Sequence, residues 1–159
     1  MPRVDGEALL LAIASISAVI AGFAAVTAAL TPPGGWSSTH RIRQRAIVST
    51  SFNVMFEALL PVIVFAWLDD VGKAVALSSA IVAIYVAWIV VTRGRQIYRA
   101  GGLSTWSGRL LYVPGITALG LFTLNAILFG SVAVYSVALC VQLSVSVISF
   151  YQLVSTVSD

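Results

Sequence analysis

Residues 46–68 read AIVSTSFNVMFEALLPVIVFAWL, and this stretch decides the fold. About 20 consecutive apolar residues in a helix are enough to cross the hydrocarbon core of a bilayer, so the stretch predicts a membrane span. Its one charged residue, Glu57, lies at the middle. An acidic side chain at that depth costs roughly 2.5 kcal/mol or more, which makes Glu57 the first candidate for a functional residue.

The polar residues of this stretch fall on one face. Steps of three and four residues return to the same side of a helix, and they connect Thr50, Asn53, Glu57 and Pro61. A proline in a helix removes one backbone hydrogen bond, so Pro61 is predicted to free a carbonyl one turn earlier, near Glu57. We also predict that Pro61 is a hinge.

The whole chain has the composition of a membrane protein. Of its 159 residues, 59% are hydrophobic and 9% are charged, whereas soluble domains carry about 25% charged residues. The 45 apolar residues 110–154 exceed one span and are predicted to fold back at Gly130-Ser131. We expect an all-α, polytopic integral membrane protein, a single bundle over residues 1–159, with five transmembrane helices at about 7–30, 46–68, 74–92, 110–129 and 132–154.

The positive charges predict the orientation. Seven of the nine basic residues lie in or beside two connecting segments that contain no acidic residue: Arg41, Arg43, Arg45, Arg93, Arg95, Arg99 and Arg109. Basic segments stay on the cytoplasmic side, so five helices place the N-terminus outside and the C-terminus in the cytoplasm. We expect a bacterial-type cytoplasmic (inner) membrane and contacts of these arginines with lipid headgroups, and no nucleic-acid partner.

Two helices carry stripes of small residues, which allow close helix packing in membranes. Together with the small number of helices, the stripes predict a homo-oligomer or docking on a membrane partner subunit. The first stripe comprises Ala14, Ala18, Ala21 and Ala25, and the second comprises Ala76, Ala80, Ala83 and Ala87.

The last helix also carries a polar stripe, which comprises Tyr135, Gln142, Ser146 and Ser149 and matches the polar residues of the Glu57 helix. The two helices are expected to run antiparallel, and counting from their ends pairs Gln142 with Glu57, Ser146 with Asn53 and Ser149 with Thr50. The pattern predicts that the helices face each other, within one protomer or between subunits. Asn125 lies about 6 Å further out at 1.5 Å per residue and is a candidate fourth member of the group.

Common catalytic and cofactor sites are not indicated. The single histidine and single cysteine do not make a haem or zinc site, and the only lysine, Lys73, lies at a helix end. No basic side chain is predicted at membrane depth to activate a serine nucleophile. We therefore expect no enzyme activity, no metal and no cofactor. Tyr85 and Trp88 could stack on a ligand, but such side chains more often pack or anchor a helix at the interface, and we assign them to that role.

Two interpretations of the polar residues remain. In the first, they line a path on which Glu57 binds or relays a cation, as acidic side chains do in cation channels, supported by Asn53, Thr50, Gln142, Ser146, Ser149 and Asn125. In the second, they only join helices in a non-conducting accessory or scaffold subunit. A third class, a lipid-interacting protein, would use the arginines. We favour a homo-oligomeric conduit for cations or protons, because an amide such as Gln would join helices without a charge.

Overall fold

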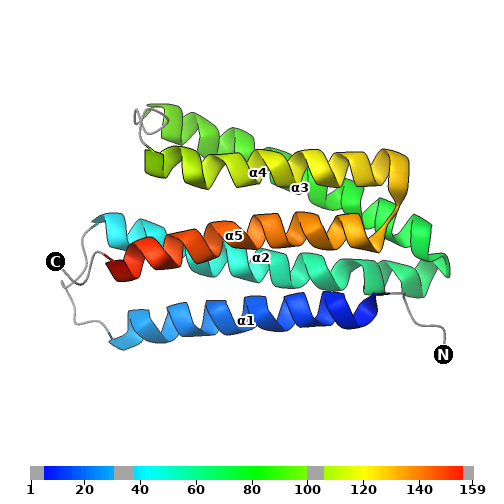
Figure 1. Ribbon diagram of the computed structural model, residues 1–159, viewed down its shortest axis with the longest axis horizontal. Coiled ribbons are helices and arrows are strands. Elements are labelled where there is room, and N and C mark those ends of the chain that lie inside the picture. The colour runs from blue at the N-terminus through cyan, green and yellow to red at the C-terminus, as the bar shows by residue number, and fades with distance from the viewer. Residues whose placement is uncertain (1–5, 31–37, 100–105, 156–159) are drawn as a thin grey trace.

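The protein is a bundle of long helices (Figure 1). The computed structural model describes residues 6–30, 38–99 and 106–155, with the side chains at 28, 30, 38–43, 93–94, 96–99, 106–111 and 152–155 left undescribed. The helices are α1 (Glu7–Leu30), α2 (Ser38–Leu68), α3 (Val71–Arg99), α4 (Trp106–Leu124) and α5 (Val132–Ser155), with a π-helical turn η2 (Asn125–Phe129) at the end of α4.

Five segments of these helices are long and apolar enough to cross a membrane, which confirms the predicted number. They contain 18 to 25 residues each, in keeping with the roughly 17–25 residues of a transmembrane helix. The chain is therefore an integral membrane protein. Helices α2, α3 and α4 extend beyond the predicted spans: α2 begins at Ser38, ahead of residue 46, α3 covers Val71–Arg99 rather than residues 74–92, and α4 begins at Trp106, ahead of residue 110.

Helices α2 and α5 lie at the centre of the bundle (Figure 1). Helix α1 packs on one side of this pair, α3 and α4 pack on the other, and α5 contacts every other helix. The C-terminal ends of α1, α3 and α5 lie at one end of the bundle with the N-terminal ends of α2 and α4. Arg45 and Arg95 thus belong to the same end, and the assignment of that end to the cytoplasm stays a prediction.

The core is formed by apolar side chains from all five helices. Leu10, Val54, Val75, Phe122 and Leu139 are each fully buried. Large apolar side chains also cover the outside of the bundle, as in Val19 and Ile84, which are 70% and 73% exposed. Lipid is as apolar as the core, so van der Waals packing and polar contacts, rather than hydrophobic burial, hold such helices together.

The first predicted stripe lies at the edge of the face that α1 buries. Ala14 and Ala21 are buried in the bundle, whereas Ala18 and Ala25 are exposed. The face that α1 turns inward consists of Leu10, Ile13, Ala14, Ser17, Ala21 and Ala24. Of the second stripe, Ala83 is buried and Ala76, Ala80 and Ala87 are half-buried, so most of this stripe lies at the edge of the face that α3 packs on its neighbours.

The connection between α2 and α3 is a two-residue turn. Asp69 has the left-handed backbone conformation, with φ of 50°. The Asp70 carboxylate accepts a hydrogen bond from the Lys73 backbone N–H at 3.0 Å and pairs with the Lys73 ammonium at 3.1 Å. These contacts favour the carboxylate and lower the pKa of Asp70 below its ordinary value. Asp70 therefore acts as the N-cap of α3.

The long apolar run folds back at Gly130, as predicted from the sequence. Gly130 has φ of 53°, a conformation that costs other residues roughly 1–2 kcal/mol. A Cβ at this position would also lie 2.7 Å from the carbonyl oxygen of Gly72 in the first turn of α3. Close approach of the Gly130 turn to the start of α3 therefore requires glycine. The Gly130 N–H donates to the Asn125 carbonyl at 2.8 Å, which closes the wide π-helical turn.

Candidate functional site

Glu57 lies in the interior of the bundle, near the middle of the span formed by Gln44–Leu68. Its side chain is 6% exposed. The Gln142 side-chain N–H donates to Glu57 Oε1 at 3.2 Å, from α5. This contact confirms that the two helices face each other within one protomer and that these two residues lie at the same depth.

The backbone carbonyl of Glu57 is also held from α5. Pro61 follows one turn later in α2 and has no N–H to donate to this carbonyl. The Tyr135 hydroxyl donates to it instead, at 2.7 Å. The sequence correctly placed a freed carbonyl near Glu57, and the structure identifies Tyr135 as the donor. Helix α5 therefore fixes Glu57 at two points, through its carbonyl and through one carboxyl oxygen.

The second carboxyl oxygen of Glu57, Oε2, is not hydrogen-bonded by α5. Oε2 is buried and has no hydrogen-bond partner among the described residues, and the same holds for Oε1 of Gln142. Buried polar atoms are nearly always paired, so an unpaired carboxyl oxygen at membrane depth is an unusual feature. It leaves Glu57 with an acceptor that is free to take up a proton or a cation.

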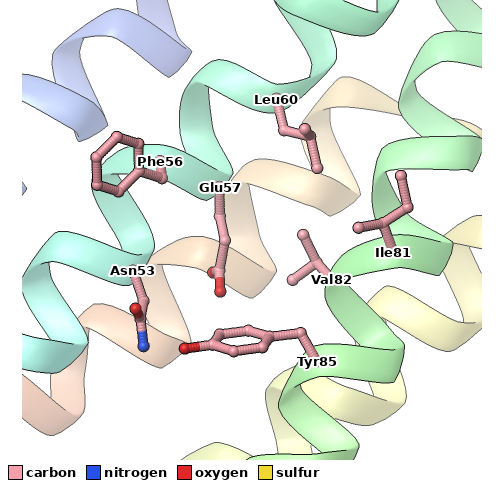
Figure 2. Close-up of a pocket in the computed structure, with 7 residues that line it drawn as sticks. All are labelled: Asn53, Phe56, Glu57, Leu60, Ile81, Val82 and Tyr85. Carbon is pink, nitrogen blue, oxygen red and sulfur yellow. The ribbon is translucent and has the colours of Figure 1, made fainter.

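A pocket of about 230 Å³ adjoins the Glu57 side chain between α2 and α3. The lining residues are Asn53, Phe56, Glu57, Leu60, Ile81, Val82 and Tyr85. Figure 2 shows the Glu57 carboxyl group pointing toward the Tyr85 ring, with the Asn53 amide beside the Tyr85 hydroxyl. The pocket thus gathers three polar groups within an apolar wall.

Tyr85 was assigned to packing or anchoring from the sequence, and the structure places it in the Glu57 pocket. Its ring stacks on Trp88, with centroids 6.4 Å apart and an angle of 25° between the planes. The sequence contains a signal for this position of Tyr85. Counting outward from the two-residue turn at Asp69 and Asp70 places residues 53–57 of α2 opposite residues 82–86 of α3, and therefore places Tyr85 beside Glu57.

The other predicted partners of the α2–α5 contact are buried but do not bond in the predicted pairs. Thr50, Ser146 and Ser149 are each less than a tenth exposed. The Ser146 hydroxyl donates to the carbonyl of Ile47 at 3.4 Å, and the Ser149 hydroxyl has no hydrogen-bond partner among the described residues. Asn53 lines the pocket rather than facing Ser146.

Asn125 takes part in a different contact from the one considered from the sequence. Its amide N–H donates to the Ser79 hydroxyl at 2.8 Å, and its amide oxygen accepts the Ser131 backbone N–H at 2.9 Å. Asn125 therefore joins α3 to the turn between α4 and α5. Asn125 bonds to this turn because the reversal of the chain at Gly130 leaves the Ser131 N–H without a backbone acceptor, and a nearby side chain supplies one.

The arginines predicted to contact lipid headgroups lie at one end of the bundle where they are described. Arg45 and Arg95 are exposed. The Gln44 amide, beside Arg45, donates to the Ala24 carbonyl at 3.1 Å and ties α2 to α1. The side chains of the other five lie outside the described residues: Arg41, Arg43, Arg93, Arg99 and Arg109.

Metal ligands do not gather anywhere in the described part of the chain, where no group of three His, Cys, Asp or Glu side chains lies close enough to hold an ion. Comparison of the chain with protein-family models, curated proteins and solved structures finds no match. The functional argument therefore rests on the chemistry of Glu57 and its surroundings.

Proposed function

We propose that the protein is a homo-oligomeric conduit for protons or cations, in which Glu57 is the ion-interacting group of each protomer. The observation that carries the proposal is the buried Glu57 carboxyl group, held at Oε1 by Gln142 and unpaired at Oε2. Ionisable residues inside a membrane bundle are rare and mark ion or proton pathways. Thr50, Asn53, Gln142, Ser146 and Ser149 are proposed as supporting residues around it.

The energetics favour an ionisable role over a purely structural one. Side-chain hydrogen bonds between membrane helices contribute about 0.6 kcal/mol on average, whereas an acidic residue at the centre of a span costs roughly 2.5 kcal/mol or more. One hydrogen bond from Gln142 does not offset that cost. A glutamine at position 57 would make the same interhelical contact without it.

The test is proton flux into liposomes that contain the purified protein and a pH-sensitive dye, driven by an imposed membrane potential. We expect Glu57→Gln to lower the flux at least tenfold, because the amide cannot exchange a proton. Glu7→Gln, which removes a carboxylate from the first turn of α1, is the matched control and should leave the flux unchanged. Repeating the assay with imposed gradients of K⁺ or Na⁺ and a dye for each ion identifies the ion.

Absence of flux in wild type and variant, with both proteins equally folded, would contradict the conduit. It would favour the alternative function, a non-conducting accessory or scaffold subunit. A stoichiometric second membrane protein that co-purifies with the chain would then identify the complex.

The outer face of α1 supports the proposed oligomer. Small residues that are all exposed follow one another at steps of three and four residues: Ser15, Ala18, Gly22, Ala25 and Ala29. Beyond the backbone of α1 itself, a Cβ at Gly22 would meet no atom of the described residues within 4 Å. Stripes of this kind let two membrane helices approach closely, so we propose that α1 contacts another copy of the chain.

Cross-linking in liposomes tests the oligomer. We expect the wild type to give dimers or larger species, and Gly22→Leu to reduce them severalfold because a large side chain holds the helices apart. Val19→Leu is the matched control, since Val19 is 70% exposed on the same helix but lies off the stripe. Monomers alone in the wild type would rule out the homo-oligomer and leave the proton-flux test unaffected.

A further inference from the structure

The apolar and aromatic lining of the pocket beside Glu57 indicates which class of cation it would bind. We propose that it binds a small organic ammonium ion with apolar substituents, and that Glu57 provides the counter-charge. The inference rests on the proposed function only for the role of Glu57 as the cation-interacting group.

The geometry combines a buried acid with an apolar wall. Glu57 is 6% exposed and its Oε2 has no partner among the described residues. Four of the seven lining side chains are apolar, namely Phe56, Leu60, Ile81 and Val82. The volume of about 230 Å³ is below the roughly 300–1,000 Å³ of pockets for drug-sized ligands. The site therefore fits a small ligand with one positive charge and an apolar body.

A metal ion fits this wall less well. Hard cations are held by about six oxygen ligands, or keep their waters. The pocket offers one carboxylate, one amide and one phenol, from Glu57, Asn53 and Tyr85. An alkylammonium ion instead needs a single counter-charge, and its substituents are stabilised by contact with apolar side chains.

Two aromatic side chains at the pocket favour an ammonium ion further. Quaternary ammonium groups bind favourably against aromatic faces. Phe56 and Tyr85 both line the pocket, and stacking on Trp88 holds the Tyr85 ring in place. Figure 2 shows the Tyr85 ring below the Glu57 carboxyl group, so a cation between them would contact both.

The pocket opens on the outside of the bundle. Phe56, Ile81 and Tyr85 are 63%, 45% and 38% exposed, and all three lie within membrane spans. A ligand dissolved in the bilayer would therefore reach Glu57 by passing between α2 and α3. Apolar substituents provide the partition into lipid that this route requires.

The test is calorimetric binding to the full chain in lipid nanodiscs, with empty nanodiscs as the blank. The probe is benzyltrimethylammonium, and its neutral isostere neopentylbenzene has the same shape without the charge. We expect saturable binding of the cation and at least tenfold weaker binding of the isostere. Equal binding of the two compounds, or no saturable binding of the cation, would overturn the proposal.

Two variants test whether the cation binds in the pocket beside Glu57. Glu57→Gln should weaken binding of the cation at least tenfold. Ile81→Trp keeps the carboxyl group and fills the pocket from its rim, so it should also weaken binding at least tenfold. Ile84→Trp is its control, since Ile84 is 73% exposed on the same helix and does not line the pocket. Unchanged binding in Ile81→Trp would overturn the assignment of the site.

The outcomes separate this inference from the conduit. Proton flux that depends on Glu57, without binding of the ammonium ion, would overturn the inference and leave the conduit standing. Binding that depends on Glu57 and Ile81, without flux of protons or metal ions, would support the pocket and contradict the conduit.

Discussion

Replacing Tyr135 by phenylalanine is expected to lower the free energy of unfolding by about 1–3 kcal/mol, the cost of a buried polar group left unpaired. Tyr135 is fully buried, and its hydroxyl is the donor to the Glu57 carbonyl at 2.7 Å. The ring would remain packed edge-on against Phe122, with centroids 5.2 Å apart. The loss therefore reports the hydrogen bond alone. Titration of SDS into mixed micelles measures the free energy of unfolding of the wild type and the variant.

A second substitution identifies the cause of this loss. Pro61→Ala restores a backbone N–H that can donate to the Glu57 carbonyl within α2. Tyr135→Phe should then cost less than about 0.5 kcal/mol in the Pro61→Ala background, because the carbonyl keeps a donor. Equal costs in the two backgrounds would show that Tyr135 does not compensate for the proline. Unchanged proton flux in Pro61→Ala would contradict the proposed hinge.

Replacing Asn125 by leucine is expected to cost about 2–4 kcal/mol of unfolding free energy, since two hydrogen bonds are lost and the Ser131 N–H is left without its acceptor. The Ser79 hydroxyl keeps its bond to the Val75 carbonyl. Asn125 is fully buried and bonds both Ser79 of α3 and the Ser131 N–H that begins the last helix. Leucine has as many side-chain heavy atoms as asparagine, so the substitution leaves no cavity. SDS titration of the wild type beside the variant measures it.

Ser79→Ala is the matched control for this effect. It removes one partner of Asn125 and leaves the contact with the Ser131 N–H in place, so we expect a loss of about 1 kcal/mol. A loss as large as that of Asn125→Leu would mean that the turn at Gly130 does not depend on Asn125. Both substitutions should leave proton flux through the remaining folded protein unchanged, because neither residue lines the Glu57 pocket.

The contacts that Glu57 of α2 makes with α5 and α3 explain how it could carry out the proposed chemistry. Helix α5 holds the carbonyl through Tyr135 and one carboxyl oxygen through Gln142. The side chain also lines the pocket between α2 and α3. A carboxyl group fixed on one side and unpaired at Oε2 is positioned to exchange a proton or a cation with little movement of the backbone. This arrangement is pre-organisation of the kind that binding sites require.

The sequence by itself determined the features that depend on local composition. Apolar runs of sufficient length predicted five spans, and the Gly130-Ser131 break separated the last two correctly. The depth of a residue in the membrane is proportional to its position along the helix. The pairing of Glu57 with Gln142 therefore followed from their positions once α2 and α5 were expected to run antiparallel. The freed carbonyl near Pro61 followed from the missing N–H of proline.

The tertiary structure alone decided how each helix is rotated. In a membrane protein both the core and the surrounding lipid are apolar, so hydropathy does not distinguish the buried face from the exposed one. For that reason the predicted stripe on α1 is only half buried, with Ala14 inside the bundle and Ala18 outside. The partners of Asn125 and the place of Tyr85 beside Glu57 likewise depend on contacts between helices.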